Sequence, residues 1–145
     1  MRGRNGPGVR EPGSRGGRKR MGACAVALAN LELFETEKTL ERLQPKIHTL
    51  ADGLKPIAAL PHVAAVRQRG FMVGVELMRD VKARVPYAFE ERLGFRVCQA
   101  ARAHGVILRP LGNTIVLMPP LSLKDDELQL LLRALHAAIV EITGA

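Results

Sequence analysis

One arginine, Arg109, stands in a local sequence that suits recognition of a carboxylate. It follows the apolar residues Val106, Ile107 and Leu108 and precedes Pro110. Because a residue before proline is held in extended geometry, we expect the side chain of Arg109 to leave the end of a short strand at a defined angle. A planar guanidinium held in this way grips a carboxylate through two parallel hydrogen bonds, which a lysine cannot reproduce. A surface ion pair is the alternative that the local sequence leaves open.

The other polar side chains form no complete catalytic set. Neither type of glycine-rich nucleotide loop is present, and Ser122 is better explained as a helix cap than as a nucleophile. Arg109 is therefore the single candidate for substrate binding, and we assign no catalytic, cofactor-binding or metal-binding residue. The histidines lack metal-ligand spacing and are expected at helix surfaces or strand ends: His48, His62, His104 and His136.

Length and composition are those of one ordinary domain. A chain of 145 residues with 47% hydrophobic content is large enough to bury a core without crosslinks. Its two cysteines, Cys24 and Cys98, are too few for a disulfide framework or a zinc cluster, which favours a cytoplasmic location. No run approaches the roughly 20 apolar residues of a membrane span.

The formal net charge of +8 is concentrated in the first 20 residues, which hold seven basic side chains and one acidic side chain. The remainder carries 15 basic and 13 acidic residues. Residues 1–21 are also rich in glycine and poor in apolar residues, so we expect a disordered basic tail ahead of a domain at 22–145. A non-enzymatic module that binds RNA or another polyanion through this tail is the alternative function, although the tail has no aromatic residue for stacking.

The first half of the domain is expected to hold two helices and a hairpin. Residues 23–35 predict a helix buried on several sides, because its apolar residues occur nearly all the way round. A secretory signal peptide is the alternative here, but the pattern continues past Asn30 as a domain helix does. An amphipathic stripe from Leu40 to Leu54 predicts the second helix, with a kink or a break at Pro45. Two strands with alternating apolar residues then flank Gly70.

The second half is expected to hold a helix, two strands and a last helix. A stripe from Phe89 to Ala101 predicts a helix that ends at Gly105 in a left-handed cap. Residues 106–109 and 114–118 read as short strands joined by a turn at 110–113. Ser122, followed three residues later by Asp125, is typical of a capping box for the last helix. This order of elements favours an α+β fold with a small, mostly antiparallel sheet covered by helices.

Five stretches of the domain occur in the same order in a known family. They are Ala23-Cys24-Ala25-Val26-Ala27-Leu28-Ala29-Asn30-Leu31-Glu32, Arg67-Gln68-Arg69-Gly70-Phe71-Met72-Val73-Gly74-Val75-Glu76-Leu77, Gly94-Phe95-Arg96-Val97-Cys98, Gly105-Val106-Ile107-Leu108-Arg109-Pro110-Leu111-Gly112-Asn113 and Val116-Leu117-Met118-Pro119-Pro120-Leu121. Together they resemble the adenosylmethionine-8-amino-7-oxononanoate aminotransferase family, which belongs to the class III, fold-type I enzymes that use pyridoxal phosphate. The resemblance covers residues 23–145, about the last quarter to third of a family member.

The resemblance implies a homodimer whose large domain carries pyridoxal 5'-phosphate and whose small domain, formed here by residues 22–145, closes over the substrate. It also implies that Arg109 binds the carboxylate of the keto acid 8-amino-7-oxononanoate, which the family converts to 7,8-diaminononanoate in biotin biosynthesis. The amino donor, S-adenosylmethionine or lysine, stays open.

The sequence departs from the family upstream of Ala23. There the family has a Gly-Asn-Pro segment, a threonine that contacts the cofactor phosphate and, farther back, the Schiff-base lysine; this chain has Arg18-Lys19-Arg20-Met21-Gly22. Transamination needs a covalently held electron sink. We therefore expect a fragment of such an enzyme, inactive by itself, for which no bound cofactor is expected. An inert fragment that associates through exposed faces is a third interpretation.

Overall fold

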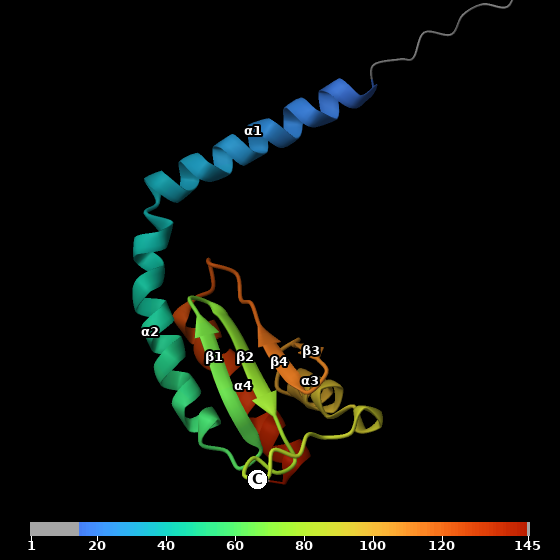
Figure 1. Cartoon of the computed structure of the whole chain (residues 1–145). Helices are drawn as coiled ribbons and strands as arrows, with labels where there is room; N and C mark the ends of the chain where they lie inside the picture. The colour runs from blue at the N-terminus through green and yellow to red at the C-terminus, as the bar shows by residue number, and fades with distance from the viewer. Residues whose placement is uncertain (1–14, 145) are drawn as a thin grey trace, which may run out of the picture. The chain divides into compact units, whose positions relative to one another are not determined.

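The computed structural model describes residues 15–144, and the side chains of 22–144 (Figure 1). The basic tail predicted at 1–21, on which the alternative of polyanion binding rests, therefore lies largely outside the described residues. The chain divides into two compact units, one ending at Thr39 and one beginning at Leu40. None of the helices in the described part of the chain combines the length and the apolar character that crossing a membrane requires.

Helix α1 (Arg15–Thr36) belongs to the first unit. The predicted boundary between residues 21 and 22 falls inside this helix. The helix itself is as expected, but its predicted burial is wrong, since Val26 and Leu28 are 70% and 67% exposed. Alanine-rich sequence with apolar residues all round forms a helix readily. Burying that surface needs a second element to pack on it, and residues 15–39, the described part of the first unit, contain no other complete helix or strand.

The second unit contains a four-stranded antiparallel sheet with helices packed on it, which confirms the predicted α+β class. In chain order its elements are α2 (Thr39–Ala58), β1 (Val63–Arg69), β2 (Met72–Leu77), a 3-10 helix (Phe89–Glu91), α3 (Leu93–Ala103), β3 (Arg109–Leu111), β4 (Thr114–Leu117) and α4 (Asp125–Thr143). The order of strands across the sheet is β1-β2-β4-β3, so that β1 and β3 form its edges.

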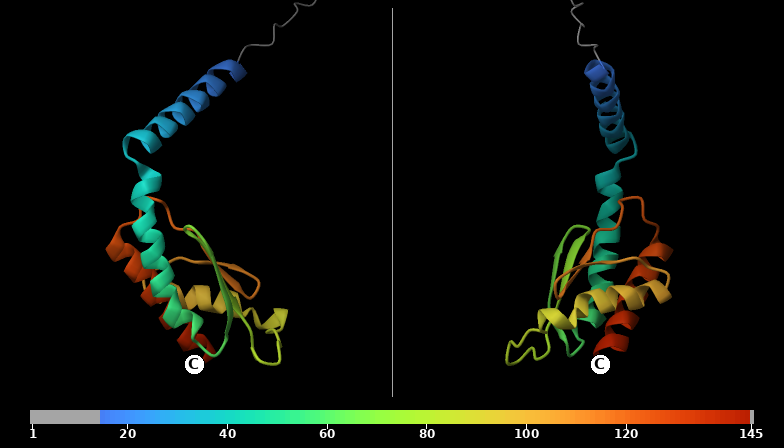
Figure 2. Two further views of the ribbon diagram at one scale, coloured as in Figure 1. Left: turned by 60° about the vertical axis from the view of Figure 1, so that its left-hand side comes forward. Right: turned by 90° about the vertical axis from the view of Figure 1, so that its right-hand side faces the viewer.

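The sheet has one covered face and one open face. Figure 2 shows α2 and α4 on the same side of the strands, and α3 packs against α4 and β3. Alternate residues of the two central strands point toward these helices and are buried, as the period of two in a strand requires. These residues are Val73, Val75, Leu77, Ile115 and Leu117. Their neighbours along each strand lie on the opposite, open face.

The helices meet the core through the predicted apolar stripes, with two departures. Helix α2 continues through Pro45, so of the predicted kink or break the break is wrong, and the kink stays a prediction. Buried residues on both sides of the proline, Leu43 and Leu50, anchor the helix across the lost hydrogen bond. Helix α3 begins at Leu93 rather than Phe89, because Arg92 takes up a left-handed conformation with φ of 48° between the 3-10 helix and α3.

Helix α4 is capped at Lys124, so the predicted cap at Ser122 is wrong. The carboxylate of Glu127 accepts a hydrogen bond of 2.8 Å from the backbone N–H of Lys124. Glutamate three residues past the cap reaches back in this way in a capping box. The acidic first turn, Asp125 to Glu127, also complements the positive end of the helix dipole.

The core packing generates a stability prediction on α4. Truncating the fully buried Leu135 to alanine should lower the free energy of unfolding by about 2–5 kcal/mol, because a cavity remains in the core. Truncating Leu130, which is 41% exposed on the same helix, should cost less than about 1 kcal/mol. Urea denaturation of both variants checks this, and equal losses at the two positions would contradict the described orientation of α4.

Candidate functional site

Arg109 lies at an edge of the sheet, on its open face. It begins β3 and pairs with Val116 of β4. Residues directly opposite in an antiparallel pair share a face. The neighbours of Val116, Ile115 and Leu117, point toward the helices, so Val116 and Arg109 face the other way. The side chain of Arg109 is exposed.

The predicted strand at 106–109 is displaced along the chain. Only Arg109 of that stretch lies in a strand, and β3 continues through Pro110 to Leu111. Proline cannot donate a hydrogen bond within a sheet, but it is tolerated at an edge. The turn is correspondingly shorter than predicted, with Gly112 and Asn113 between the paired residues Leu111 and Thr114.

Hydrogen bonds from Asn113 hold this turn. Gly112 has φ of +59° at the first central position of the two-residue turn, where a type II′ hairpin needs a positive φ. The side-chain amide of Asn113 donates to the Tyr87 carbonyl at 2.9 Å, and its backbone carbonyl accepts from the N–H of Leu77 at 2.9 Å. The hairpin that carries Arg109 is thereby tied to β2 and to the loop that follows it.

The first turn of α3 packs closely against the same hairpin at a glycine. A Cβ atom placed on Gly94 would lie 2.1 Å from the carbonyl oxygen of Gly112 and 3.4 Å from the Cβ of Pro110. No side chain fits in that space, so glycine is what permits this approach. Apart from the glycine itself, no local pattern in the sequence indicates this contact, because its two partners lie far apart in the chain.

The segment that leads into Arg109 is fixed at its start by the end of α3. Gly105 has φ of +81°. Its N–H donates a hydrogen bond of 3.0 Å to the carbonyl of Arg102, and the N–H of Val106 donates one of 3.1 Å to the carbonyl of Ala101. This pattern is a Schellman motif, which confirms the predicted left-handed cap. Val106 is half-buried after the cap, whereas Ile107 is 83% exposed.

Arg109 is one of the residues that line an open cleft of about 570 Å³. Most of the lining is apolar, and the other charged residue is Glu127, whose carboxylate already accepts the N–H of Lys124. Within the described residues no carboxylate lies within 4.0 Å of the Arg109 guanidinium, so the alternative of an ion pair is not observed. The cleft is also lined by Gly105, Val106, Ile107, Leu108, Val116, Leu117, Met118, Pro119, Pro120, Leu123, Leu130 and Leu131.

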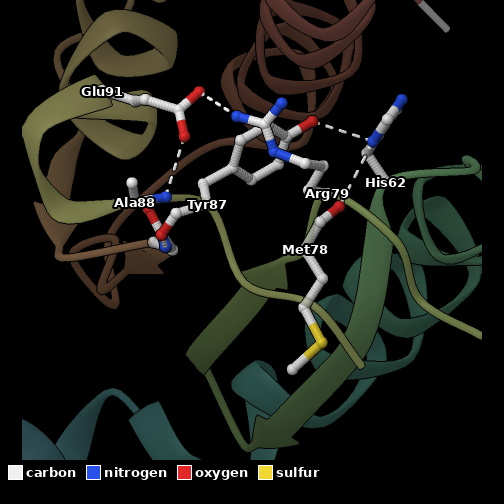
Figure 3. A network of polar contacts seen from close by, with 7 residues as sticks. His62, Met78, Arg79, Tyr87, Ala88 and Glu91 are labelled. Atoms are coloured by element: carbon white, nitrogen blue, oxygen red, sulfur yellow. Dashed lines mark hydrogen bonds and ion pairs between the residues drawn. The ribbon is translucent and has the colours of Figure 1, made fainter. Parts of the chain in front are cut away.

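A network of polar contacts surrounds Tyr87, whose carbonyl accepts the hydrogen bond from Asn113 (Figure 3). The Nδ1 atom of His62 lies 2.8 Å from the Tyr87 hydroxyl oxygen and 3.2 Å from the Met78 carbonyl oxygen. Arg79 pairs with Glu91 and lies over the Tyr87 ring. The hydrogen bond from Arg79 lowers the pKa of Glu91, while burial raises the pKa of Tyr87. Every member has a partner, so we interpret this network as structural.

The other residues considered from sequence do not gather at the cleft. His62 directly precedes β1, at a strand end as expected, and the part of the chain from 22 to 144 contains no group of three or more potential metal ligands. Both cysteines are free, and burial raises the pKa of Cys98 to about 11. Among the lysines in that part, Lys46 donates to the carbonyl of Leu123 and Lys55 pairs with Asp52, and none lines the cleft.

Comparison with known proteins assigns the chain to a family. Residues 18–139 match the class-III aminotransferase family, and the chain belongs to it. Adenosylmethionine-8-amino-7-oxononanoate aminotransferases from Nitratidesulfovibrio vulgaris and Aquifex aeolicus are 51% and 50% identical to it. Each match covers 83% of this chain but only 22% and 26% of the relative, so the chain spans about a quarter of the length of these relatives.

Solved structures agree with this assignment. The crystal structure of adenosylmethionine-8-amino-7-oxononanoate aminotransferase from Methanocaldococcus jannaschii superimposes with a TM-score of 0.80 at 44% identity, over 82% of this chain and 27% of that one. A PMP-bound aminotransferase from Vibrio fluvialis superimposes with a TM-score of 0.79 at 26% identity, over 83% and 27%. The predicted resemblance to a fold-type I aminotransferase domain is confirmed.

The close approach at Gly94 generates a prediction. Gly94→Ala should lower the free energy of unfolding by about 1–3 kcal/mol, because the added methyl forces α3 away from the β3–β4 turn. Gly74→Ala is the matched control, since its Cβ would meet only Thr114 Cγ2 at 3.5 Å, and its stability should be unchanged or slightly higher. Urea denaturation measures both, and a neutral Gly94→Ala would show that the approach is not tight.

The two thiols should differ in reactivity at pH 8. The thiolate is the reactive form, and Cys98 is both buried and shifted to a pKa of about 11, whereas Cys24 is exposed. A colorimetric thiol reagent should therefore titrate one rapid thiol in the native protein and two in urea. In Cys24→Ser the rapid phase should disappear. Persistence of that phase would place Cys98 at the surface.

Proposed function

We propose that residues 22–145 form the substrate-binding small domain of a pyridoxal-phosphate-dependent aminotransferase that converts 8-amino-7-oxononanoate to 7,8-diaminononanoate in biotin biosynthesis. The names of the relatives support the reaction. The observation that carries the role of this domain is Arg109, an arginine without a carboxylate partner in the described structure, which lies on the open face of the sheet at its edge. Arg109 also lines a cleft that extends to α4.

Arg109 is proposed to bind and orient the keto acid through its carboxylate. Two parallel hydrogen bonds from one guanidinium fix both the position and the rotation of a carboxylate. The arginine projects from a backbone held by Pro110 and by a hairpin tied to β2 through Asn113. A ligand bound there is held in one position and orientation by a rigid backbone. Such positioning of a reactant accelerates its reaction.

The cofactor would be held outside these residues. Pyridoxal phosphate supplies the electron sink for amino-group transfer when it is bound to such an enzyme. In the described part of the chain, the cleft beside Arg109 contains no lysine to attach it covalently. We therefore propose that the 145-residue polypeptide alone does not transaminate. The intact enzyme is proposed to be a homodimer in the cytoplasm, where free thiols such as Cys24 and Cys98 persist.

The role of Arg109 can be measured in a chimera in which residues 23–145 replace the matching segment of the Nitratidesulfovibrio vulgaris enzyme. Arg109→Ala should lower kcat/KM for 8-amino-7-oxononanoate. The decrease should correspond to a loss of about 2–5 kcal/mol of transition-state stabilisation, as when one partner of a desolvated charge pair is removed. Arg109→Lys should recover only part of this, because an ammonium cannot form the paired geometry. Unchanged KM and kcat/KM in Arg109→Ala would remove the assignment.

A further inference from the structure

A glycine lies in the middle of β2 without a structural reason for being there. Gly74 does not have a positive φ, and a Cβ atom on it would meet Thr114 Cγ2 at 3.5 Å, an ordinary contact distance. A glycine inside a strand weakens the strand, because it adds backbone entropy and no side-chain packing. Neither the backbone conformation nor the packing of this chain requires glycine at 74. Such glycines mark places where another molecule or segment approaches the strand closely.

Gly74 lies in the same row of the sheet as Arg109. Arg109 pairs with Val116, and Val116 pairs with Gly74, so the three residues face the same open side. Adjacent strands lie roughly 4.8 Å apart, which puts the backbone of Gly74 about 10 Å from that of Arg109 across the sheet. The next residue of the row is Arg67, on β1.

A second hollow, of about 320 Å³, lies over Gly74 and is also lined by Val116, the residue of β4 that pairs with both Gly74 and Arg109. Met72 and Met118 line the same hollow and expose 56% and 67% of their surface. At the far side the guanidinium of Arg67 lies 3.1 Å from the carboxylate of Glu76, which offsets its charge.

We infer that Gly74 is a specificity-determining residue: the aliphatic chain of a carboxylic acid held by Arg109 lies across β4 and β2, over Val116 and Gly74. This inference rests on the proposed function and extends it. Because Gly74 has no side chain, no group projects from β2 at this point of the open face. An unbranched chain therefore lies across the strand while its carboxylate stays at Arg109. The site therefore selects unbranched medium-chain carboxylates over short ones.

Binding of butanoate and nonanoate to the 145-residue chain, followed by NMR below the micellar concentration of nonanoate, tests the inference. Nonanoate should bind at least about tenfold more tightly than butanoate, since each methylene removed from water adds to affinity. It should also shift the amide signals of Val116 and Gly74. Gly74→Leu should abolish this advantage and leave butanoate binding unchanged, and Gly74→Ala, whose methyl the fold accepts, should reduce it.

Two control variants separate the possible failures. Gln99→Leu adds the same side chain to the exposed surface of α3, outside both hollows, and should keep the preference for nonanoate. A full preference for nonanoate in Gly74→Leu and Gly74→Ala would overturn the inference and leave the role of Arg109 intact. Carboxylate binding that is unaffected by Arg109→Gln would overturn the proposed function, and this inference with it.

Discussion

The arrangement of the site depends on one close contact, between the start of α3 and the β3–β4 turn. Gly94 and the carbonyl of Gly112 approach so closely that a methyl group at 94 would overlap the turn. Asn113 ties the same turn to β2 and to the loop that follows it. A short edge strand of three residues has little packing of its own, so these contacts decide where Arg109 lies.

The sheet separates stability from binding by its two faces. Alternate residues of β2 and β4 fill the core beneath the helices, and the residues between them form the open face. Substitutions at Arg109 or Gly74 therefore change a surface that the core does not use. Arg109 and the hollow over Gly74 belong to that one surface, because Val116 pairs with Arg109 and also lines the hollow. A binding surface of this kind can vary while the fold is retained.

Much of the fold follows from local patterns in the sequence. Alternation around Gly70 predicts the first hairpin, helical stripes predict α2 and α4, and Gly105 predicts the cap of α3. The errors arise where an interaction distant in the chain decides the outcome. Packing on both sides of Pro45 keeps α2 continuous, and pairing with β4 moves β3 past its predicted end. The exposure of α1 cannot be read from its own composition, because burial depends on a partner element.

The candidate site was only partly predictable for the same reason. Arg109 could be selected because Pro110 follows it directly, and motifs shared with a family supported its role. The contact at Gly94 and the open row through Gly74 connect residues that are distant in the sequence, so no local pattern reveals them.

The central claim is that Arg109 grips a carboxylate on the open face of the sheet. A crystal structure of the chimeric enzyme with 8-amino-7-oxononanoate tests it most directly. The account predicts that both carboxylate oxygens lie within hydrogen-bond distance of the Arg109 guanidinium, with the aliphatic chain over Val116. A keto acid bound with its carboxylate elsewhere, and Arg109 turned away into solvent, would contradict it.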